Sequence, residues 1–177
     1  MTTQILIAGF GGQGVLFAGK FLAYKGLTED MQVSWLPSYG PEMRGGTANC
    51  SVVLSDTPVG SPIITNPDVL VAMNLPSLQK YVDSVVPGGQ IYLDSALINE
   101  KVTRTDVEVF YIPATQMAKD ENIASLANMI LIGSLLQNNS ELSFEGTQEV
   151  VAKLVPPKKA ALVELNMKAL TLGKEYK

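Results

Sequence analysis

The sequence predicts a three-layer α/β/α sandwich built on a mostly parallel, Rossmann-like sheet with an antiparallel excursion at its edge. Residues 4–8 and 68–73 each consist of one polar residue followed by an apolar run without polar alternation, which is typical of strands buried on both faces of a parallel sheet. A glycine-rich turn follows the first run, and apolar residues then recur at helical spacing from Val15. The alternating segment 48–54 and the apolar residues 59–64 are separated by a turn, which favours an antiparallel hairpin.

The other elements follow in order along the chain. Strands are expected at residues 31–36, 90–94 and 107–112, and helices at 76–85, 114–119, 123–136, 144–154 and 158–174. The helix at 123–136 is apolar nearly all round, so we expect it to be buried in the core or beneath another subunit. A chain of 177 residues can bury a sizeable core, and we expect one domain covering residues 1–177.

The loop between the first strand and the first helix contains Gly9, Gly11 and Gly14 in the pattern G-x-G-x-x-G. Glycine permits a tight turn and a close approach, and the free N–H groups of a helix N-terminus favour an anion. A dinucleotide-binding fold also needs an acidic ribose ligand about twenty residues further on. The second strand instead ends in Leu36-Pro37-Ser38, which counts against NAD. The loop serves either turn geometry or ligand binding, and its candidate contact residues are Gly11, Gly12, Gln13 and Gly14.

A second glycine-rich loop runs from Ser38 to Thr47 and combines long polar side chains with a proline and three glycines. Loops of this composition often carry functional sites. Either Glu42 and Arg44 pair locally in a structural turn, or the segment contacts a ligand or a partner subunit. An arginine suits the second alternative, because it binds a phosphate or carboxylate through two hydrogen bonds. The candidate contact residues are Ser38, Tyr39, Glu42, Arg44, Gly45 and Gly46.

Two more polar residues have a structural explanation beside a functional one. Asp94 ends an expected strand, where it could contact a ligand, although capping a helix or turn is the commoner role. Cys50 lies in an alternating strand. Because the chain has no histidine to activate a thiol, we expect Cys50 to be a buried small residue.

Composition excludes several classes of protein. A net charge of -4, with 13 scattered Lys and Arg, counts against nucleic acid, which needs clustered basic residues. The start of the chain lacks the features of a signal peptide, and the longest apolar stretch is too short for a bilayer, so we expect a cytoplasmic protein without a membrane contact. One cysteine and no histidine exclude an internal disulfide, a cluster held by this chain alone and Ser-His or Cys-His catalysis.

With both loops in view, the sequence resembles the gamma subunit of the 2-oxoacid:ferredoxin oxidoreductases, a module that also occurs as a domain of pyruvate:ferredoxin oxidoreductase. The resemblance extends over nearly the whole chain and is nearest to the 2-oxoglutarate, or generic 2-oxoacid, branch. Its motifs are Gly9-Phe10-Gly11-Gly12-Gln13-Gly14-Val15, Ser38-Tyr39-Gly40-Pro41-Glu42-Met43-Arg44-Gly45-Gly46, Ala127-Asn128-Met129 and Glu164-Leu165-Asn166.

The resemblance implies that this chain is one subunit of a larger enzyme. Such complexes decarboxylate a 2-oxoacid on thiamine diphosphate with Mg, pass electrons through iron-sulfur clusters to ferredoxin, and transfer the acyl group to coenzyme A. This chain lacks the Gly-Asp-Gly of a thiamine diphosphate site and a set of cysteines for a cluster. The resemblance therefore places these cofactors in alpha, beta and delta-type partner subunits. It implies that this chain has no catalytic or metal-binding residue, is inactive alone and shapes the approach of substrate and coenzyme A.

Two alternatives accompany this hypothesis. The chain could be a free-standing module that binds coenzyme A or a nucleotide at the glycine loop, or the corresponding subunit of an indolepyruvate oxidoreductase.

Overall fold

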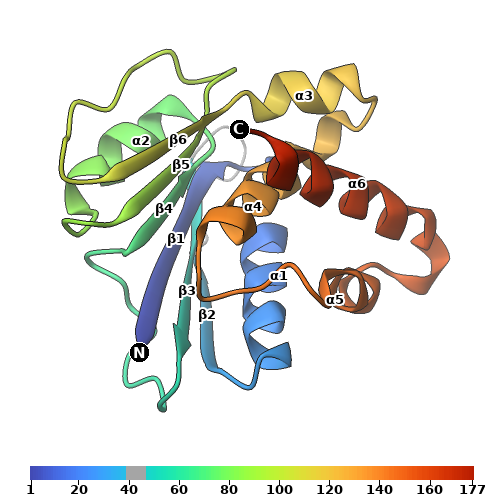
Figure 1. The fold of residues 1–177 in the computed structure, drawn as a ribbon, viewed down its shortest axis with the longest axis horizontal. Coiled ribbons are helices and arrows are strands. Elements are labelled where there is room, and N and C mark those ends of the chain that lie inside the picture. The colour runs from blue at the N-terminus through green and yellow to red at the C-terminus, as the bar shows by residue number, and fades with distance from the viewer. Residues whose placement is uncertain (39–46) are drawn as a thin grey trace.

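The computed structural model describes residues 1–38 and 47–177, which form one six-stranded sheet with helices on both faces (Figure 1). The order of the strands across the sheet is β2-β3-β1-β4-β5-β6. Strands β1, β4, β5 and β6 are mutually parallel, and β3 is antiparallel to both of its neighbours. The strand bounds are β1 Thr2–Phe10, β2 Gln32–Ser38, β3 Thr47–Ser55, β4 Val69–Ala72, β5 Gln90–Asp94 and β6 Glu108–Ile112.

The predicted fold class is confirmed, and the structure corrects its antiparallel part. Strand β3 lies between β1 and β2, one strand in from the edge, and β2 takes the edge position. The predicted strand at residues 59–64 is wrong, because these residues form bends without strand pairing. Pro58 and Pro62 supply no backbone N–H and Gly60 has no side chain to pack, so the segment is poorly suited to a strand ladder.

The helices divide between the two faces of the sheet (Figure 1). The larger core contains side chains from α1, α3, α4, α5 and α6, and the smaller core on the other face contains Leu78 of α2 together with Leu6, Leu70 and Ile91. The helix bounds are α1 Val15–Thr28, α2 Leu75–Tyr81, α3 Ala114–Asp120, α4 Ala127–Asn138, α5 Thr147–Leu154 and α6 Ala161–Glu175. Within the described ranges, no helix has the length and apolar character that a membrane span requires.

Three predicted helices include a 3₁₀ turn at one end, and the one expected at 158–174 has it at Pro157–Lys159, before α6. The helix expected at 76–85 is α2 followed by a 3₁₀ turn at Val82–Ser84, and the helix expected at 123–136 begins with a 3₁₀ turn at Ala124–Leu126 before α4. Residues Asn128 to Leu136 of α4 are all buried, which confirms that this apolar helix lies in the core.

Helix α4 crosses α6 at two glycines. A Cβ atom at Gly133 would lie 2.0 Å from the carbonyl oxygen of Leu170, and one at Gly173 would lie 1.8 Å from the carbonyl oxygen of Ile130. Both obstacles are backbone atoms of the opposite helix, so no side chain can turn aside to make room. The close crossing of α4 and α6 therefore requires glycine at both positions.

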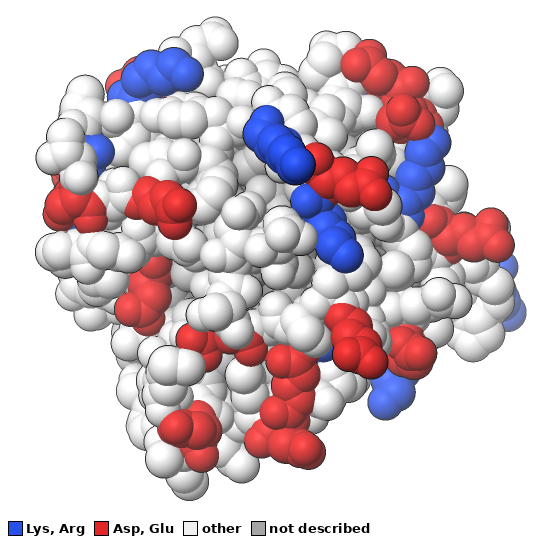
Figure 2. Space-filling view, in the orientation of Figure 1, with Lys and Arg blue, Asp and Glu red and all other residues white. Residues whose placement is uncertain are grey.

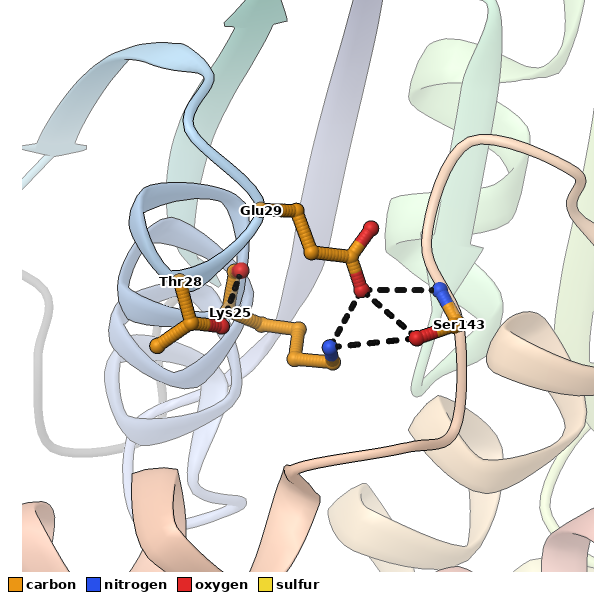
Figure 3. Close-up of polar contacts among 4 residues, drawn as sticks. All are labelled: Lys25, Thr28, Glu29 and Ser143. Carbon is orange, nitrogen blue, oxygen red and sulfur yellow. Dashed lines mark hydrogen bonds and ion pairs between the residues drawn. The ribbon is translucent and has the colours of Figure 1, made fainter.

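A partly buried ion pair connects the end of α1 to the segment that precedes α5 (Figure 3). Lys25 is only 2% exposed and pairs with Glu29 one turn later. The same carboxylate oxygen accepts hydrogen bonds from the backbone N–H of Ser143 at 3.0 Å and from its hydroxyl at 2.8 Å. Ser143 is far from Glu29 in sequence, so this cluster joins two distant parts of the chain.

The environment of Glu29 lowers the pKa of its carboxyl below the ordinary value of 4.5. Partial burial acts in the opposite direction, and the hydrogen bonds from Lys25 and Ser143 together outweigh it. A lowered pKa means that the carboxylate stabilises the fold above pH 4.5 and that this contribution is lost as the pH falls through the folded-state pKa.

The glycine crossing predicts that Gly133→Ala and Gly173→Ala each lower the free energy of unfolding by at least about 2 kcal/mol. Alanine is the better helix former, so the loss must come from the collision with the opposite backbone. Urea unfolding followed by circular dichroism measures it. Gly60→Ala is the matched control, since a Cβ there meets no atom within 4 Å, and its effect should stay within about 0.5 kcal/mol. Equal stability of all three variants would contradict the packing described.

The Lys25–Glu29–Ser143 cluster predicts that Glu29→Gln lowers the free energy of unfolding at neutral pH by about 1–2 kcal/mol, because charge-assisted hydrogen bonds are lost. The difference from the parent protein should shrink as the pH falls below 4.5, where the parent carboxylate also becomes neutral. Urea unfolding over a pH series provides the measurement.

Glu121→Gln is the control for this series, because Glu121 forms an exposed ion pair with Lys168, with both side chains more than 40% exposed. Exposed pairs contribute little to stability. A Glu29→Gln effect that does not change with pH would contradict the role assigned to the carboxylate.

Candidate functional site

The carboxyl ends of β1 and β4 lie side by side at the point in the sheet where the chain changes the direction in which it adds strands. From β1 the chain passes through α1 on one face toward β2, and from β4 it passes through α2 on the other face toward β5. The two strands are neighbours, with Ala8 opposite Ala72. In open α/β sheets this reversal leaves a crevice outside the strand ends, and that crevice is the usual ligand site.

Gln13 closes the glycine loop against the end of β4. Its Oε1 atom accepts a hydrogen bond from the backbone N–H of Phe10 at 2.6 Å, and its Nε2 atom donates to the carbonyl oxygen of Met73 at 3.1 Å. Gly12 and Gly14 have φ angles of 92° and 76°, in the left-handed region that favours glycine. The glycines thus serve turn geometry, and a side chain holds the turn in place.

Asn128, at the start of α4, reaches the same loop from a distant part of the chain. Its Nδ2 atom donates a hydrogen bond to the carbonyl oxygen of Gly14 at 3.0 Å. A Cβ atom at Gly14 would lie 2.4 Å from that nitrogen, so glycine is required there for space as well as for its φ angle. Two of the sequence motifs singled out above, 9–15 and 127–129, therefore form one unit.

Asp94, at the end of β5, lies beside this unit and is 2% exposed. One carboxylate oxygen accepts hydrogen bonds from the backbone N–H of Thr115 at 3.1 Å and from its hydroxyl at 2.6 Å, and the other accepts from the N–H of Ala96 at 3.1 Å. Of the two roles considered for Asp94, the structure shows the cap: its carboxylate holds the start of α3 and the turn after β5.

These residues surround a cavity of about 220 Å³ at the carboxyl end of the sheet. The described residues that line it are Gly12, Gln13, Met73, Asp94, Leu97, Thr115, Ala124, Ser125, Ala127, Asn128 and Leu131. Among them are one carboxylate and neither Lys nor Arg. Local sequence patterns indicated Gly12 and Gln13 as site residues, but they did not indicate Asn128 or Thr115, whose position depends on how distant helices pack.

The second candidate loop is described at its two ends. Ser38 is exposed at the end of β2, and β3 begins at Thr47, which lies opposite Phe10 of β1. Both ends of this second loop therefore lie at the carboxyl end of β1, which is also where the glycine loop begins. Tyr39, Glu42, Arg44, Gly45 and Gly46 lie outside the described residues, so their predicted role stays a prediction.

Cys50 is fully buried in β3, and its thiol donates a hydrogen bond to the carbonyl oxygen of Val15 at 3.4 Å. Burial raises the pKa of this thiol to about 12, so it stays neutral at physiological pH. The predicted role of Cys50 as a buried small residue is confirmed. In the part of the chain that the structure describes, no group of three or more acidic or cysteine side chains could hold a metal ion.

The described basic side chains do not gather on the face shown in Figure 2. Lys and Arg are interspersed there with Asp and Glu, with wide uncharged areas between them. A nucleic-acid-binding face would carry a continuous basic patch.

The sequence of this chain matches the family model described as pyruvate ferredoxin/flavodoxin oxidoreductase over residues 4–176. It is 38% identical over 174 residues to the ketoisovalerate oxidoreductase subunit VorA of Methanothermobacter thermautotrophicus, covering 98% of this chain and 36% of VorA. It is 35% identical over 182 residues to the 2-oxoglutarate synthase subunit KorC of Methanothermobacter marburgensis, covering 99% of this chain and 96% of KorC. The chain thus spans about a third of VorA and nearly all of KorC.

Solved structures are similar to this chain over nearly its whole length. The gamma subunit of a keto/oxoacid ferredoxin oxidoreductase from Geobacter sulfurreducens superposes with a TM-score of 0.83 at 29% identity, covering 98% of this chain and 96% of that one. The 2-oxoglutarate:ferredoxin oxidoreductase of Magnetococcus marinus, solved with 2-oxoglutarate, coenzyme A and succinyl-CoA bound, gives a TM-score of 0.88 at 25% identity, covering 98% of this chain and 30% of that one. The indolepyruvate oxidoreductase subunit IorB of Pyrococcus horikoshii is more distant, at 27% identity.

The two hydrogen bonds of Gln13 predict that Gln13→Ala loosens the glycine loop and lowers the free energy of unfolding by about 1–2 kcal/mol. The amide hydrogen of Phe10 loses its acceptor, so its exchange with solvent should become faster. Hydrogen exchange measured by NMR tests this locally. Gln116→Ala is the control, because Gln116 makes an exposed hydrogen bond within α3. Unchanged exchange at Phe10 would contradict the role assigned to Gln13.

Proposed function

Because the chain belongs to the pyruvate ferredoxin/flavodoxin oxidoreductase family, we propose that it is the gamma subunit of a 2-oxoglutarate:ferredoxin oxidoreductase. The observation that carries this proposal is the match to KorC, which extends over 96% of that relative. VorA has similar identity but only 36% of its length is covered, so KorC is the better guide to the role of a chain of this kind.

The proposed complex oxidatively decarboxylates 2-oxoglutarate to an acyl-CoA and reduces ferredoxin. We assign thiamine diphosphate, Mg and the iron-sulfur clusters to alpha, beta and delta-type partner subunits. The residues of this chain do not fit an iron-sulfur cluster, which normally takes four thiolates, since its one cysteine is buried with a raised pKa. The proposed role of the chain is therefore to bind partner subunits and to shape the approach of substrate and coenzyme A in the cytoplasm.

Two surfaces are proposed for these contacts. One is the glycine loop, with Gly11, Gly12, Gln13 and Gly14, beside the cavity at the carboxyl end of the sheet. The other is the loop from Ser38 to Gly46, where Arg44 would bind a carboxylate or phosphate. The Magnetococcus marinus enzyme, solved with coenzyme A bound, contains a part similar to this chain, which supports coenzyme A as a ligand of the proposed complex.

A free-standing module that binds coenzyme A or a nucleotide is the second candidate function. A cavity at the switch point of the sheet is compatible with it. An indolepyruvate oxidoreductase subunit is less well supported, because IorB is less similar than KorC.

Co-purification tests the proposal. A tagged copy expressed in its native cell should bring down subunits that contain thiamine diphosphate and iron-sulfur clusters, and the purified complex should reduce ferredoxin with 2-oxoglutarate and coenzyme A. Arg44→Ala should lower the yield of the complex or its turnover at least about tenfold, equivalent to about 1.4 kcal/mol, without changing the thermal midpoint of the isolated chain.

Lys20→Ala, which removes one basic side chain at an exposed position, is the control and should leave assembly and turnover unchanged. A tagged chain that purifies alone and binds coenzyme A tightly by itself would favour the free-standing module. Oxidation of a 2-oxoacid by the isolated chain would contradict both candidates.

A further inference from the structure

Strand β6 lies at the edge of the sheet opposite β2, and one of its own edges is open (Figure 1). Its ladder with β5 uses the backbone groups of alternate residues. The N–H of Glu108 donates to the carbonyl oxygen of Gly89, and the carbonyl oxygen of Ile112 accepts from the residue that follows β5. Val109 and Tyr111 alternate with these residues, so their N–H and C=O groups point away from β5. No described residue bonds to those groups, which leaves two donors and two acceptors open.

The sequence of β6 does not block pairing with a further strand. Edge strands of natural proteins commonly carry a proline, a lysine or a bulge that prevents such pairing. The other edge strand, β2, contains Pro37, which has no N–H. Strand β6 reads Glu-Val-Phe-Tyr-Ile, so four of its five residues are β-branched or aromatic and none is proline, glycine or lysine. We therefore expect another strand to cover this edge.

A groove of about 590 Å³ lies along the open edge, on the side of the sheet that α4 and α6 cover. Phe110 stacks on Tyr92 with the ring centroids 4.6 Å apart, and it stays half-buried at the groove. The described lining includes two lysines and no acidic residue, so the groove suits an apolar occupant that brings a carboxylate. The lining residues are Val109, Phe110, Tyr111, Ile112, Ser134, Gln137, Asn138, Lys174, Tyr176 and Lys177.

We propose that the occupant is β6 of a second copy of this chain, paired antiparallel across a two-fold axis at Phe110. In this register Val109 of each copy lies opposite Tyr111 of the other, and all of the open N–H and C=O groups of the two strands bond to one another. A β-branched residue opposite an aromatic one is a favourable cross-strand pair. A register centred on Tyr111 would instead place Val109 opposite Pro113, which has no N–H to donate.

The same axis brings unlike charges together. Glu108 of one copy lies opposite Ile112 of the other. Ile112 and Lys177 line the same groove, and the C-terminus lies near the carboxyl end of β6 in Figure 1. Glu108 and Lys177 are both exposed, so the carboxylate of one copy can approach the ammonium group of the other. This complementarity favours a second copy over an unrelated strand, and the proposal does not rest on the proposed function.

Hydrogen exchange of the full chain at increasing concentration tests the pairing. The amide hydrogens of Val109 and Tyr111 have no acceptor among the described residues, so their exchange should slow at least about tenfold as the dimer forms. The Glu108 amide, which donates to Gly89 at 2.9 Å, is the internal control and should be protected at every concentration. Sedimentation of the same samples should show a monomer–dimer equilibrium.

Two substitutions test the register. Val109→Pro removes an outward N–H and breaks no bond to β5, so it should raise the dissociation constant of the dimer at least about tenfold and leave the fold intact. Glu108→Lys should weaken the dimer through repulsion from Lys177, and adding Lys177→Glu should restore it. Glu164→Lys, the same charge change at an exposed position of α6, is the control and should leave dimerisation unchanged.

Four results would overturn the proposal: a chain that stays monomeric at millimolar concentration, slow exchange of the Val109 and Tyr111 amides in the monomer, a dimer that is insensitive to Val109→Pro, or no rescue by Lys177→Glu. A monomeric chain that binds other subunits, and loses them on Val109→Pro, would show that a different protein supplies the strand. A chain that dimerises as described but purifies without other subunits would contradict only the gamma-subunit proposal.

Discussion

The hydrogen bond from Asn128 to the carbonyl oxygen of Gly14 is the contact on which the carboxyl end of the sheet depends. It joins the first turn of a buried helix to the loop after the first strand, more than a hundred residues earlier in the chain. Gln13 then ties that loop to the end of β4, so three elements meet with no room for a side chain at Gly14. A rigid loop between rigid neighbours is what a binding surface requires, because little ordering remains to be done when a partner or ligand arrives.

Local sequence patterns were sufficient to predict most of the helices and strands. They were not sufficient to predict which of these elements lie next to one another in the fold. The apolar runs at 4–8 and 68–73 are central strands, and Cys50 is buried, as their sequences predict. The strand predicted at 59–64 failed because Pro62 within it and Pro58 directly before it outweigh its apolar residues. The position of β3 between β1 and β2 depends on pairing between distant segments, which no local period encodes. For the same reason Asn128 could be read as part of a motif but not as a neighbour of Gly14.

The chemistry of the chain fits a subunit that organises a reaction carried out on other chains. It has no histidine, and its one thiol is neutral and enclosed, so neither an imidazole base nor a reactive thiolate is available in this chain. The polar groups that converge at the switch point instead hold the backbone in place, as Asp94 and Gln13 do. Membership of the pyruvate ferredoxin/flavodoxin oxidoreductase family and a supporting role are therefore compatible.

The insertion of β3 also sets the order in which the sheet can assemble during synthesis. A strand, helix and parallel strand in sequence commonly form a unit that folds early, but β1 and β2 have no direct contact in the ladder, because β3 separates them. When the ribosome has released β1, α1 and β2, the edge strand still has no backbone partner. The unit can close only after Ser55 has emerged, and until then the uncharged strands β1 and β2 remain exposed to chaperones and to other nascent chains.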